Sequence, residues 1–168
     1  MPRRISSTGG FLKYALSLAR NGDYETALLI IQRIEKRVLS GVDLQKIALA
    51  HSYGGKLAAS EASWLEIERR NEMKSGGYLM LASLQMELLK PTQAIESLEK
   101  EIQLAKTNSN QYYLSSALIR LSYLQMRAND YSKAKETLAL VNDNEGDFIP
   151  GMGYKTKVDL LSEIRKIN

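Results

Sequence analysis

The sequence of 168 residues contains no cysteine, one histidine, three prolines and no long apolar run. Without cysteine the chain forms no disulfide, no thiolate metal site and no cysteine nucleophile. The few prolines, together with 11 glycines, exclude a collagenous or low-complexity class. Since no stretch of eighteen apolar residues exists, the sequence predicts no membrane span. What remains is a globular protein of ordinary composition, 44% hydrophobic and 25% charged.

Groups that could carry catalysis are also scarce. His51 is the only histidine, and no second histidine or carboxylate stands at metal-ligand spacing from it. Glu66 and Glu68 do not share a helix face, and Glu66 is better placed for an i,i+4 ion pair with Arg70. The glycine pairs lack the spacing of a phosphate-binding loop and follow no strand. The sequence therefore predicts a non-catalytic protein with no metal and no cofactor.

The net charge of +4 is concentrated at one end of the chain. The first 22 residues hold four basic side chains and no acid: Arg3, Arg4, Lys13 and Arg20. Removing these four from the 23 basic residues leaves 19, which equals the 19 acidic residues. A nucleic-acid partner is disfavoured, because it would require a basic patch along a face.

The compartment is predicted from the same features. A chain without cysteine fits a reducing compartment, and we expect the protein in the cytoplasm. The basic and acid-poor N-terminal segment is also compatible with organelle targeting. The only apolar stretch in it is interrupted by Lys13, which argues against a secretory signal.

Apolar residues recur at three- and four-residue steps along nearly the whole chain, as in Leu12, Ala15, Leu16 and Ala19. The strict alternation that indicates strands is missing. Breaks at Asn21–Asp23, Ser40-Gly41, Gly54-Gly55, Lys74–Gly77, Thr107–Asn110 and Asn129-Asp130 divide the pattern. Asp43 is the expected cap of the third helix, and Pro91 suits a first helical turn. Helices are predicted near 10–21, 24–39, 43–53, 56–71, 77–89, 91–106, 110–128, 131–141 and 153–167, with 142–153 irregular.

The breaks recur with similar neighbours. Gly22-Asp23-Tyr24-Glu25-Thr26-Ala27 resembles Asn129-Asp130-Tyr131-Ser132-Lys133-Ala134, and Leu89-Lys90-Pro91-Thr92-Gln93-Ala94 occupies the matching place between them. This arrangement resembles the tetratricopeptide repeat, in which an aromatic residue precedes a small alanine by three positions. Taking Ala62 as the alanine of the second unit gives spacings of 35, 32 and 40 residues, against about 34 for a regular array. The resemblance covers roughly residues 8–142.

The resemblance implies an all-α fold: a right-handed α-solenoid of about four helix-turn-helix hairpins with a C-terminal capping helix. Residues 1–8 would form a flexible basic tip, and residues 9–168 a single helical-repeat domain. The capping helix would present Tyr154, Val158, Leu161 and Ile164 on one face.

In tetratricopeptide proteins the first helix of each hairpin lines a concave groove. Carried over to this chain, that geometry predicts a partner-binding groove formed by Leu12, Leu16, Arg20, Ile47, His51, Leu79, Ser83, Met86, Ile119, Tyr123, Met126 and Arg127. This set is rich in apolar residues, and an amphipathic helix or extended apolar segment would suit it. The alternative interpretation is that these residues are buried by the superhelix, by the capping helix or by a second copy in a homodimer.

The sequence thus favours a protein-interaction module: an adaptor, an assembly factor, a chaperone-like protein or an immunity-type binder. Two alternatives stay open. One is a regulatory domain that senses a peptide or small ligand, and the other is a helical-repeat protein associated with RNA. The RNA alternative predicts steep salt dependence of binding, which the neutral body of the chain does not favour.

Overall fold

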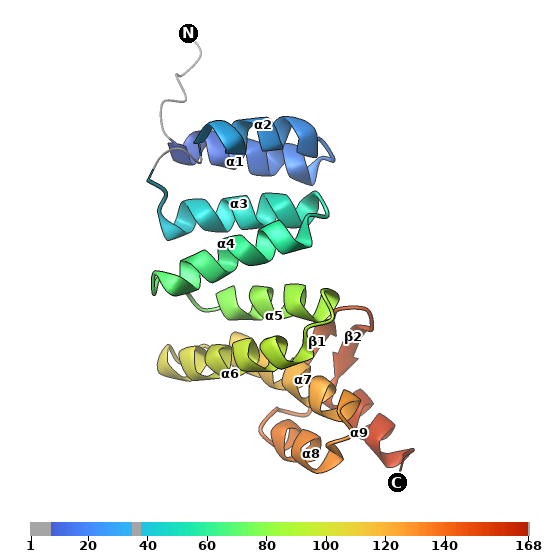
Figure 1. The fold of residues 1–168 in the computed structure, drawn as a ribbon. Helices are drawn as coiled ribbons and strands as arrows, with labels where there is room; N and C mark the ends of the chain where they lie inside the picture. The colour runs from blue at the N-terminus through green and yellow to red at the C-terminus, as the bar shows by residue number, and fades with distance from the viewer. Residues whose placement is uncertain (1–7, 35–37, 168) are drawn as a thin grey trace. The chain divides into compact units, whose positions relative to one another are not determined.

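The computed structural model describes residues 8–34 and 38–167 (Figure 1). The chain divides into two compact units, residues 1–73 and 74–168, and each is described by itself. Most of residues 1–8, the predicted basic tip, lies outside the described part; Thr8 begins the first helix. The prediction that 9–168 acts as a single domain stays a prediction.

The described residues of the first unit form four helices. They are α1 (Thr8–Arg20), α2 (Tyr24–Ile34), α3 (Gly41–Tyr53) and α4 (Leu57–Arg69). Helix α1 packs against both α2 and α3, and α3 packs against α4. The interior between them is filled by small and branched apolar residues, among them Leu12, Ala15, Ala27, Ile31 and Ile47.

The second unit contains a β-hairpin as well as helices. It contains α5 (Gly77–Glu87), α6 (Pro91–Thr107), α7 (Gln111–Arg127), α8 (Tyr131–Ala139), β1 (Gly146–Ile149), β2 (Gly153–Thr156) and α9 (Lys157–Arg165). Helix α6 packs between α5 and α7, α8 packs on α7, β1 lies against α7, and α9 contacts α8, α7 and β2. One core cluster is shared by the helices and β1, and Leu98, Ile119, Leu138, Ile149, Leu160 and Ile164 are its most buried large members.

The chain is mostly helical, as predicted, and the described helix boundaries fall close to those expected. Helix α6 begins at Pro91, where a missing N–H costs no hydrogen bond. The predicted cap of the third helix is corrected: Ser40 is the N-cap residue, and Asp43 is the third helical residue of a capping box with it. The second helix is described to Ile34; residues 35–37 lie outside the described part, and Val38–Ser40 are not helical.

The same three-residue turn joins the helices of each pair α1–α2, α3–α4, α5–α6 and α7–α8. Its middle residue has a positive φ in every case: 87° at Gly22, 69° at Gly55, 59° at Leu89 and 61° at Asn129. In all four turns, the N–H of the third residue donates a hydrogen bond of 2.8–2.9 Å to the backbone carbonyl five residues earlier. This bond satisfies a carbonyl at the end of the first helix and fixes where the second helix begins.

A fully buried small residue follows each of these turns by the same interval. The residues are Ala27, Ser60, Ala94 and Ala134, each with 0% of its surface exposed. The assignment of Ala62 to this position is wrong: Ala62 is exposed, and Ser60 occupies the site and donates a 2.7 Å hydrogen bond to the carbonyl of Ala48. With Ser60 the spacings become 33, 34 and 40 residues.

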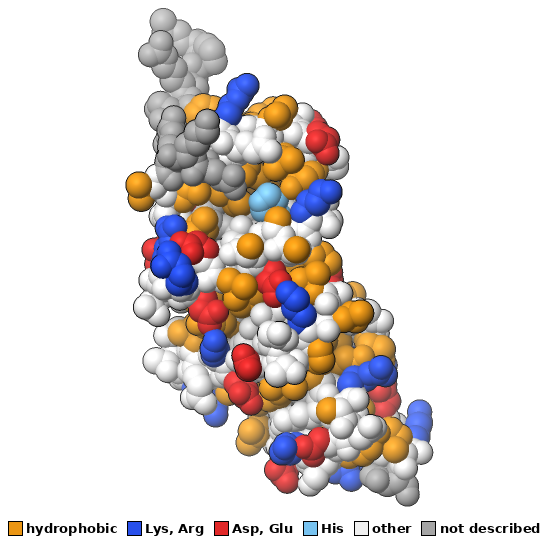
Figure 2. Space-filling model, in the orientation of Figure 1, with side chains coloured by type: hydrophobic (Ala, Val, Ile, Leu, Met, Phe, Trp, Pro, Cys, Tyr) orange, Lys and Arg blue, Asp and Glu red, His pale blue; other side chains and the backbone are white. Residues whose placement is uncertain are grey.

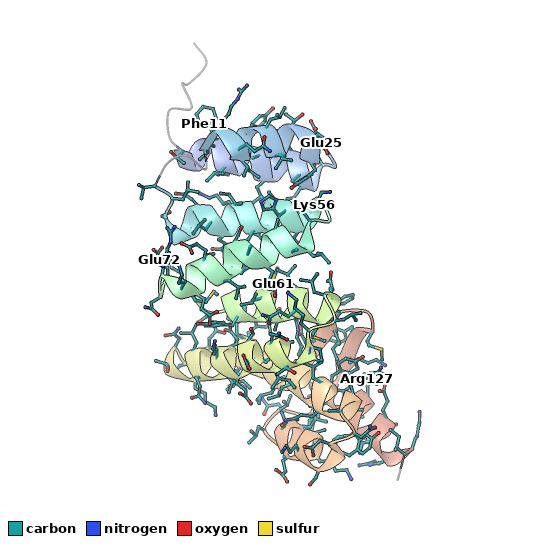
Figure 3. The ribbon with its side chains drawn as sticks, in the orientation of Figure 1. Phe11, Glu25, Lys56, Glu61, Glu72 and Arg127 are labelled. Carbon is teal, nitrogen blue, oxygen red and sulfur yellow. The ribbon has the colours of Figure 1, made fainter. Side chains whose placement is uncertain are left out.

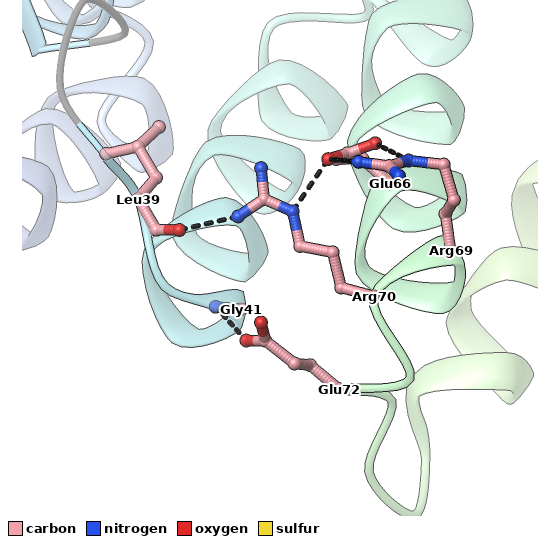
Figure 4. A network of polar contacts seen from close by, with 6 residues as sticks. All are labelled: Leu39, Gly41, Glu66, Arg69, Arg70 and Glu72. Carbon is pink, nitrogen blue, oxygen red and sulfur yellow. Dashed lines mark hydrogen bonds and ion pairs between the residues drawn. The ribbon is translucent and has the colours of Figure 1, made fainter.

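A polar network fastens the segment before α3 to the end of α4 (Figure 4). Arg70 donates to Glu66 at 2.6 Å and to the carbonyl of Leu39 at 2.7 Å, and Arg69 pairs with Glu66 through two bonds of 2.7 Å. The predicted Glu66–Arg70 pair is therefore confirmed. These bonds from Arg69 and Arg70 lower the pKa of Glu66 to about 2. Glu72 accepts the first N–H of α3, from Gly41, at 2.5 Å.

A buried carboxylate plays the same part at the start of α5. Glu101 of α6 has none of its surface exposed and accepts N–H bonds from Gly76 at 2.7 Å and Leu79 at 3.3 Å. Burial raises the pKa of Glu101, while the bonds from Gly76 and Leu79 act in the opposite direction.

The hairpin of β1 and β2 corrects the expectation of an irregular stretch followed directly by a helix. The strands pair antiparallel, with Phe148 opposite Tyr154 and Ile149 opposite Gly153. Burial alternates along β1, but two positions hold the opposite residue type: Asp147 is buried and Phe148 is 62% exposed, whereas Ile149 is buried as usual. A buried acid beside an exposed aromatic conceals the period of two that predicts a strand.

The last helix begins at Lys157 rather than near 153, because Thr156 and Asp159 form a capping box there. The predicted face is right at Leu161 and Ile164, which pack in or against the core, and is corrected at the other two residues: Tyr154 lies in β2 and Val158 is 59% exposed. Leu160 is the further buried residue of α9.

Candidate partner-binding groove

A hollow of about 720 Å³ opens on the second unit, where α5 ends, α6 begins and the C-terminal half of α7 passes the hairpin turn. Figure 2 shows hydrophobic side chains on the surface of the region where α5, the hairpin and α7 lie. The residues that line the hollow, called the groove from here on, are Met86, Glu87, Leu89, Pro91, Thr92, Ile95, Tyr123, Leu124, Arg127, Ala128, Pro150 and Gly151.

The walls of the groove are mainly apolar and partly open to solvent. Met86, Ile95 and Tyr123 are half-buried and pack against the core cluster with part of their surface. The thioether of Met86 adapts its shape easily, and Tyr123 combines a large apolar ring with a hydroxyl. Such walls suit apolar side chains of a ligand better than a charged ligand.

Two charges of opposite sign stand among these walls, Glu87 at the end of α5 and Arg127 at the end of α7. Arg127 is labelled in Figure 3 beside the hairpin. Within residues 8–34 and 38–167, neither side chain has a hydrogen-bond or ion-pair partner. Both charges are exposed to solvent and are free to meet complementary charges on a ligand.

Leu89 is the most unusual of the residues that line the groove. It holds a left-handed backbone with φ of 59°, and its side chain is 86% exposed. For a residue with a Cβ this conformation costs about 1–2 kcal/mol. At the equivalent turn positions the chain has Gly22, Gly55 and Asn129, residue types that adopt this conformation more readily.

A buried ion pair supports the hairpin wall of the groove. Arg120 of α7 donates from Nε to Asp147 of β1 at 2.5 Å, and both side chains are about one-tenth exposed. The same guanidinium donates to the carbonyl of Leu79 at 3.3 Å and to the hydroxyl of Ser83, both in α5. Because Arg120 thus connects α5, α7 and β1, it fixes the elements that carry the groove walls.

The structure brings three of the sequence-predicted site residues together in the groove: Met86, Tyr123 and Arg127. They come from the ends of α5 and α7. Ser83 lies one turn before Met86, is half-buried and is engaged with Arg120 and with the carbonyl of Leu79.

The structure places six other predicted site residues in the interior, with at most 8% of their surface exposed. They are Leu12, Ile47, His51, Leu79, Ile119 and Met126. Their side chains fill space between helices, because a helix of a stacked pair needs an apolar face toward each neighbour. As the chain is folded, these six do not offer a free surface.

The two remaining predicted residues, Leu16 and Arg20, lie in the first unit. Leu16 is half-buried, and Arg20 is exposed with its guanidinium 5.2 Å from the ring centre of Tyr53. The Nδ1 atom of His51 is 2.7 Å from the hydroxyl of Tyr24, a hydrogen bond between α3 and α2. The only histidine therefore has a structural contact within its unit.

Sequence reasoning missed the part of the groove that comes from turns and from the start of α6, including Leu89, Pro91 and Ile95. The family geometry draws attention to first helices alone, and turns received only a role as breaks. The sequence did contain a signal: the turn at residues 88–90 has leucine in its middle position, where the matching turns have glycine or asparagine. The dipeptide Pro150-Gly151 was likewise a turn signal between two short β-prone segments.

No described helix is both long and apolar enough to cross a membrane. In the same part of the chain, no group of three or more histidine, aspartate or glutamate side chains is arranged to hold a metal ion. Comparison of the chain with protein-family models, with curated proteins and with solved structures gives no significant match.

Proposed function

We propose that this protein is a non-catalytic interaction module that holds a helix or peptide of another protein in the groove of the second unit. The observation that carries the proposal is the groove itself: a hollow of about 720 Å³ with mainly apolar, partly exposed walls and two unpaired charges. Apolar side chains that are partly exposed in a groove favour binding of an apolar ligand, because binding removes their surface from water. Helix-in-groove recognition works in this way.

The architecture that we propose for the chain is a right-handed solenoid of four hairpins, similar to tetratricopeptide proteins, closed by α9. Two regularities support it: the buried small residue at a fixed distance after each hairpin turn, and the spacings of 33 and 34 residues between the first three of these residues. These values lie close to the period of about 34 residues in that family. The hairpin of β1 and β2 is an addition that such repeats do not require.

A second candidate function is the sensing of a small ligand or short peptide by a regulatory domain. The volume of the groove favours this candidate, since pockets for small molecules range over about 300–1,000 Å³. The RNA alternative gains no support, because the groove contains one basic and one acidic side chain rather than a basic patch.

The test is affinity capture from native extract by wild type and by a double variant, Met86→Glu with Tyr123→Glu. Tyr112→Glu is the matched control, because Tyr112 is 69% exposed on α7 and lies outside the groove. We expect a protein captured by wild type and by the control to be lost by the folded double variant. Equal capture by all three would place the binding surface elsewhere. If the purified protein binds a small molecule and captures no protein, the sensor candidate is favoured.

A further inference from the structure

We infer that Leu89 is the anchor residue of the groove, and that the groove takes an amphipathic helix carrying a basic residue for Glu87 and an acidic residue for Arg127. The inference rests on the proposed function and goes beyond it by assigning a specificity-determining residue and the chemistry of the partner. It starts from one conflict between sequence and backbone.

The conflict is that Leu89 is unfavourable for the fold on two counts. Its φ of 59° belongs to a region that glycine and asparagine enter more easily. Its side chain is 86% exposed, so little packing within the chain compensates for that strain. A non-glycine residue held in a strained conformation without internal contacts indicates a role outside the fold.

The comparison with the other turns narrows that role. Directly after helices, the other left-handed positions hold Gly22, Gly55, Asn71, Ser109 and Asn129. Leu89 is the one of these six with a large apolar side chain, and it lines the groove, where the other left-handed residue is Gly151 of the hairpin turn. A rigid backbone turn with an exposed leucine places an apolar side chain beside Met86 and Pro91, where it can cover a ligand.

The charges identify the occupant. Glu87 lies two residues before Leu89, and Arg127 lies on the α7 wall, both unpaired among the described residues. A partner with an apolar face flanked by one cation and one anion would neutralise both and bury the leucine. In a helix, apolar residues at i, i+3, i+4 and i+7 produce such a face and leave flanking positions for the two charges.

The probe is a displayed library of 16-residue peptides with that apolar pattern and with randomised flanking positions, selected on the full chain. Selected peptides are then titrated against Leu89→Gly, Leu89→Met and Ser109→Gly. We expect Leu89→Gly to weaken binding about tenfold or more, as truncation of an anchor does. Leu89→Met keeps an apolar side chain and is expected to retain most of the affinity.

The same variants separate binding from stability. Leu89→Gly removes the left-handed strain, so we expect its melting temperature to stay level or rise while its affinity falls. Ser109→Gly relieves the same backbone conformation outside the groove, and its affinity should be unchanged. A structural role for Leu89 would instead lower the melting temperature together with the affinity, and that result would overturn the inference.

Charge reversal tests the second half of the inference. Peptides that bind wild type should bind the double variant Glu87→Lys with Arg127→Glu more weakly, and exchange of the two peptide charges should restore their affinity. If selected peptides bind through the groove, and are lost with Tyr123→Glu, yet ignore Leu89 and the charges, this inference fails and the proposed function stands. If no peptide is selected, or if Tyr123→Glu changes nothing, both fail.

Discussion

The hydroxyl of Ser97 in α6 donates a 2.8 Å hydrogen bond to the side-chain carbonyl of Gln85 in α5, and both residues are at least 96% buried. Forty residues further along the chain, Thr137 of α8 makes the same 2.8 Å bond to Gln125 of α7. Donor and acceptor are twelve residues apart in both pairs. The two hairpins thus repeat a polar contact between their helices as well as an apolar one.

Loss of one hydroxyl should reveal how much this contact contributes. Ser97→Ala leaves the carbonyl oxygen of Gln85 buried without its partner, and we expect the free energy of unfolding to fall by about 1–3 kcal/mol. Gln85→Leu with Ser97→Ala removes both polar groups and should recover part of that loss. Urea unfolding of the four members of this cycle gives the values, and a stable Ser97→Ala single variant would speak against a structural role for the bond.

The position of the repeat in the second hairpin can be tested by enlarging one side chain at a time. Ser60→Leu places a large residue at a site with no exposed surface and removes the bond to Ala48, so we expect a loss of about 1–3 kcal/mol or more. Ala62→Leu is its matched control, since Ala62 is exposed and such changes stay within about 0.5 kcal/mol. The reverse order of stabilities in urea unfolding would restore Ala62 as the repeat position.

The ion pair of Arg120 and Asp147 should hold the hairpin in place. Asp147→Asn leaves a buried guanidinium without its counter-charge, which typically costs about 3–5 kcal/mol. Hydrogen exchange should then quicken across residues 146–156 first. Arg120→Met with Asp147→Leu serves as control, because an apolar replacement of both partners is often neutral. Unchanged exchange in Asp147→Asn would mean that the pair does not fasten the hairpin.

The capping box of α9 gives a prediction for pH. Hydrogen bonds from the backbone N–H of Thr156 at 2.8 Å and from its hydroxyl at 2.7 Å lower the pKa of Asp159 below 3.8. A depressed folded-state pKa contributes stability above the unfolded value of 3.8, and this contribution is lost as pH falls through the folded value. Asp159→Asn should therefore melt below wild type at pH 7, and the gap should narrow as pH falls below 3.8 and through the lowered pKa of Asp159. A gap independent of pH would contradict this assignment.

The helices could be predicted because their signals are local. Breaks at Gly22, Gly55 and Asn129 and the proline at 91 mark where helices end and begin, whatever the rest of the chain does. Strand β1 was not predictable in this way. One of its two buried positions holds Asp147, whose charge is tolerated there because Arg120, 27 residues earlier, supplies a counter-charge.

The site was predictable in part for a related reason. A helical period identifies apolar faces but does not say which face meets another helix. Ile47 and Ile119 were therefore predicted to line a groove, whereas the structure buries them between helices. Met86 and Tyr123 fell at the ends of helices, where packing is incomplete. Leu89 depended on backbone conformation, which periodicity does not report.

Methionine methyl NMR tests most directly whether a partner covers the groove of the second unit. Met86 lines the groove, whereas Met80 is 38% exposed on the same helix and lies outside it. On titration with a selected peptide or captured partner, the account predicts a large shift of the Met86 methyl signal and little change at Met80. A partner that binds with Met86 unmoved, or that moves Met80 alone, would contradict the account.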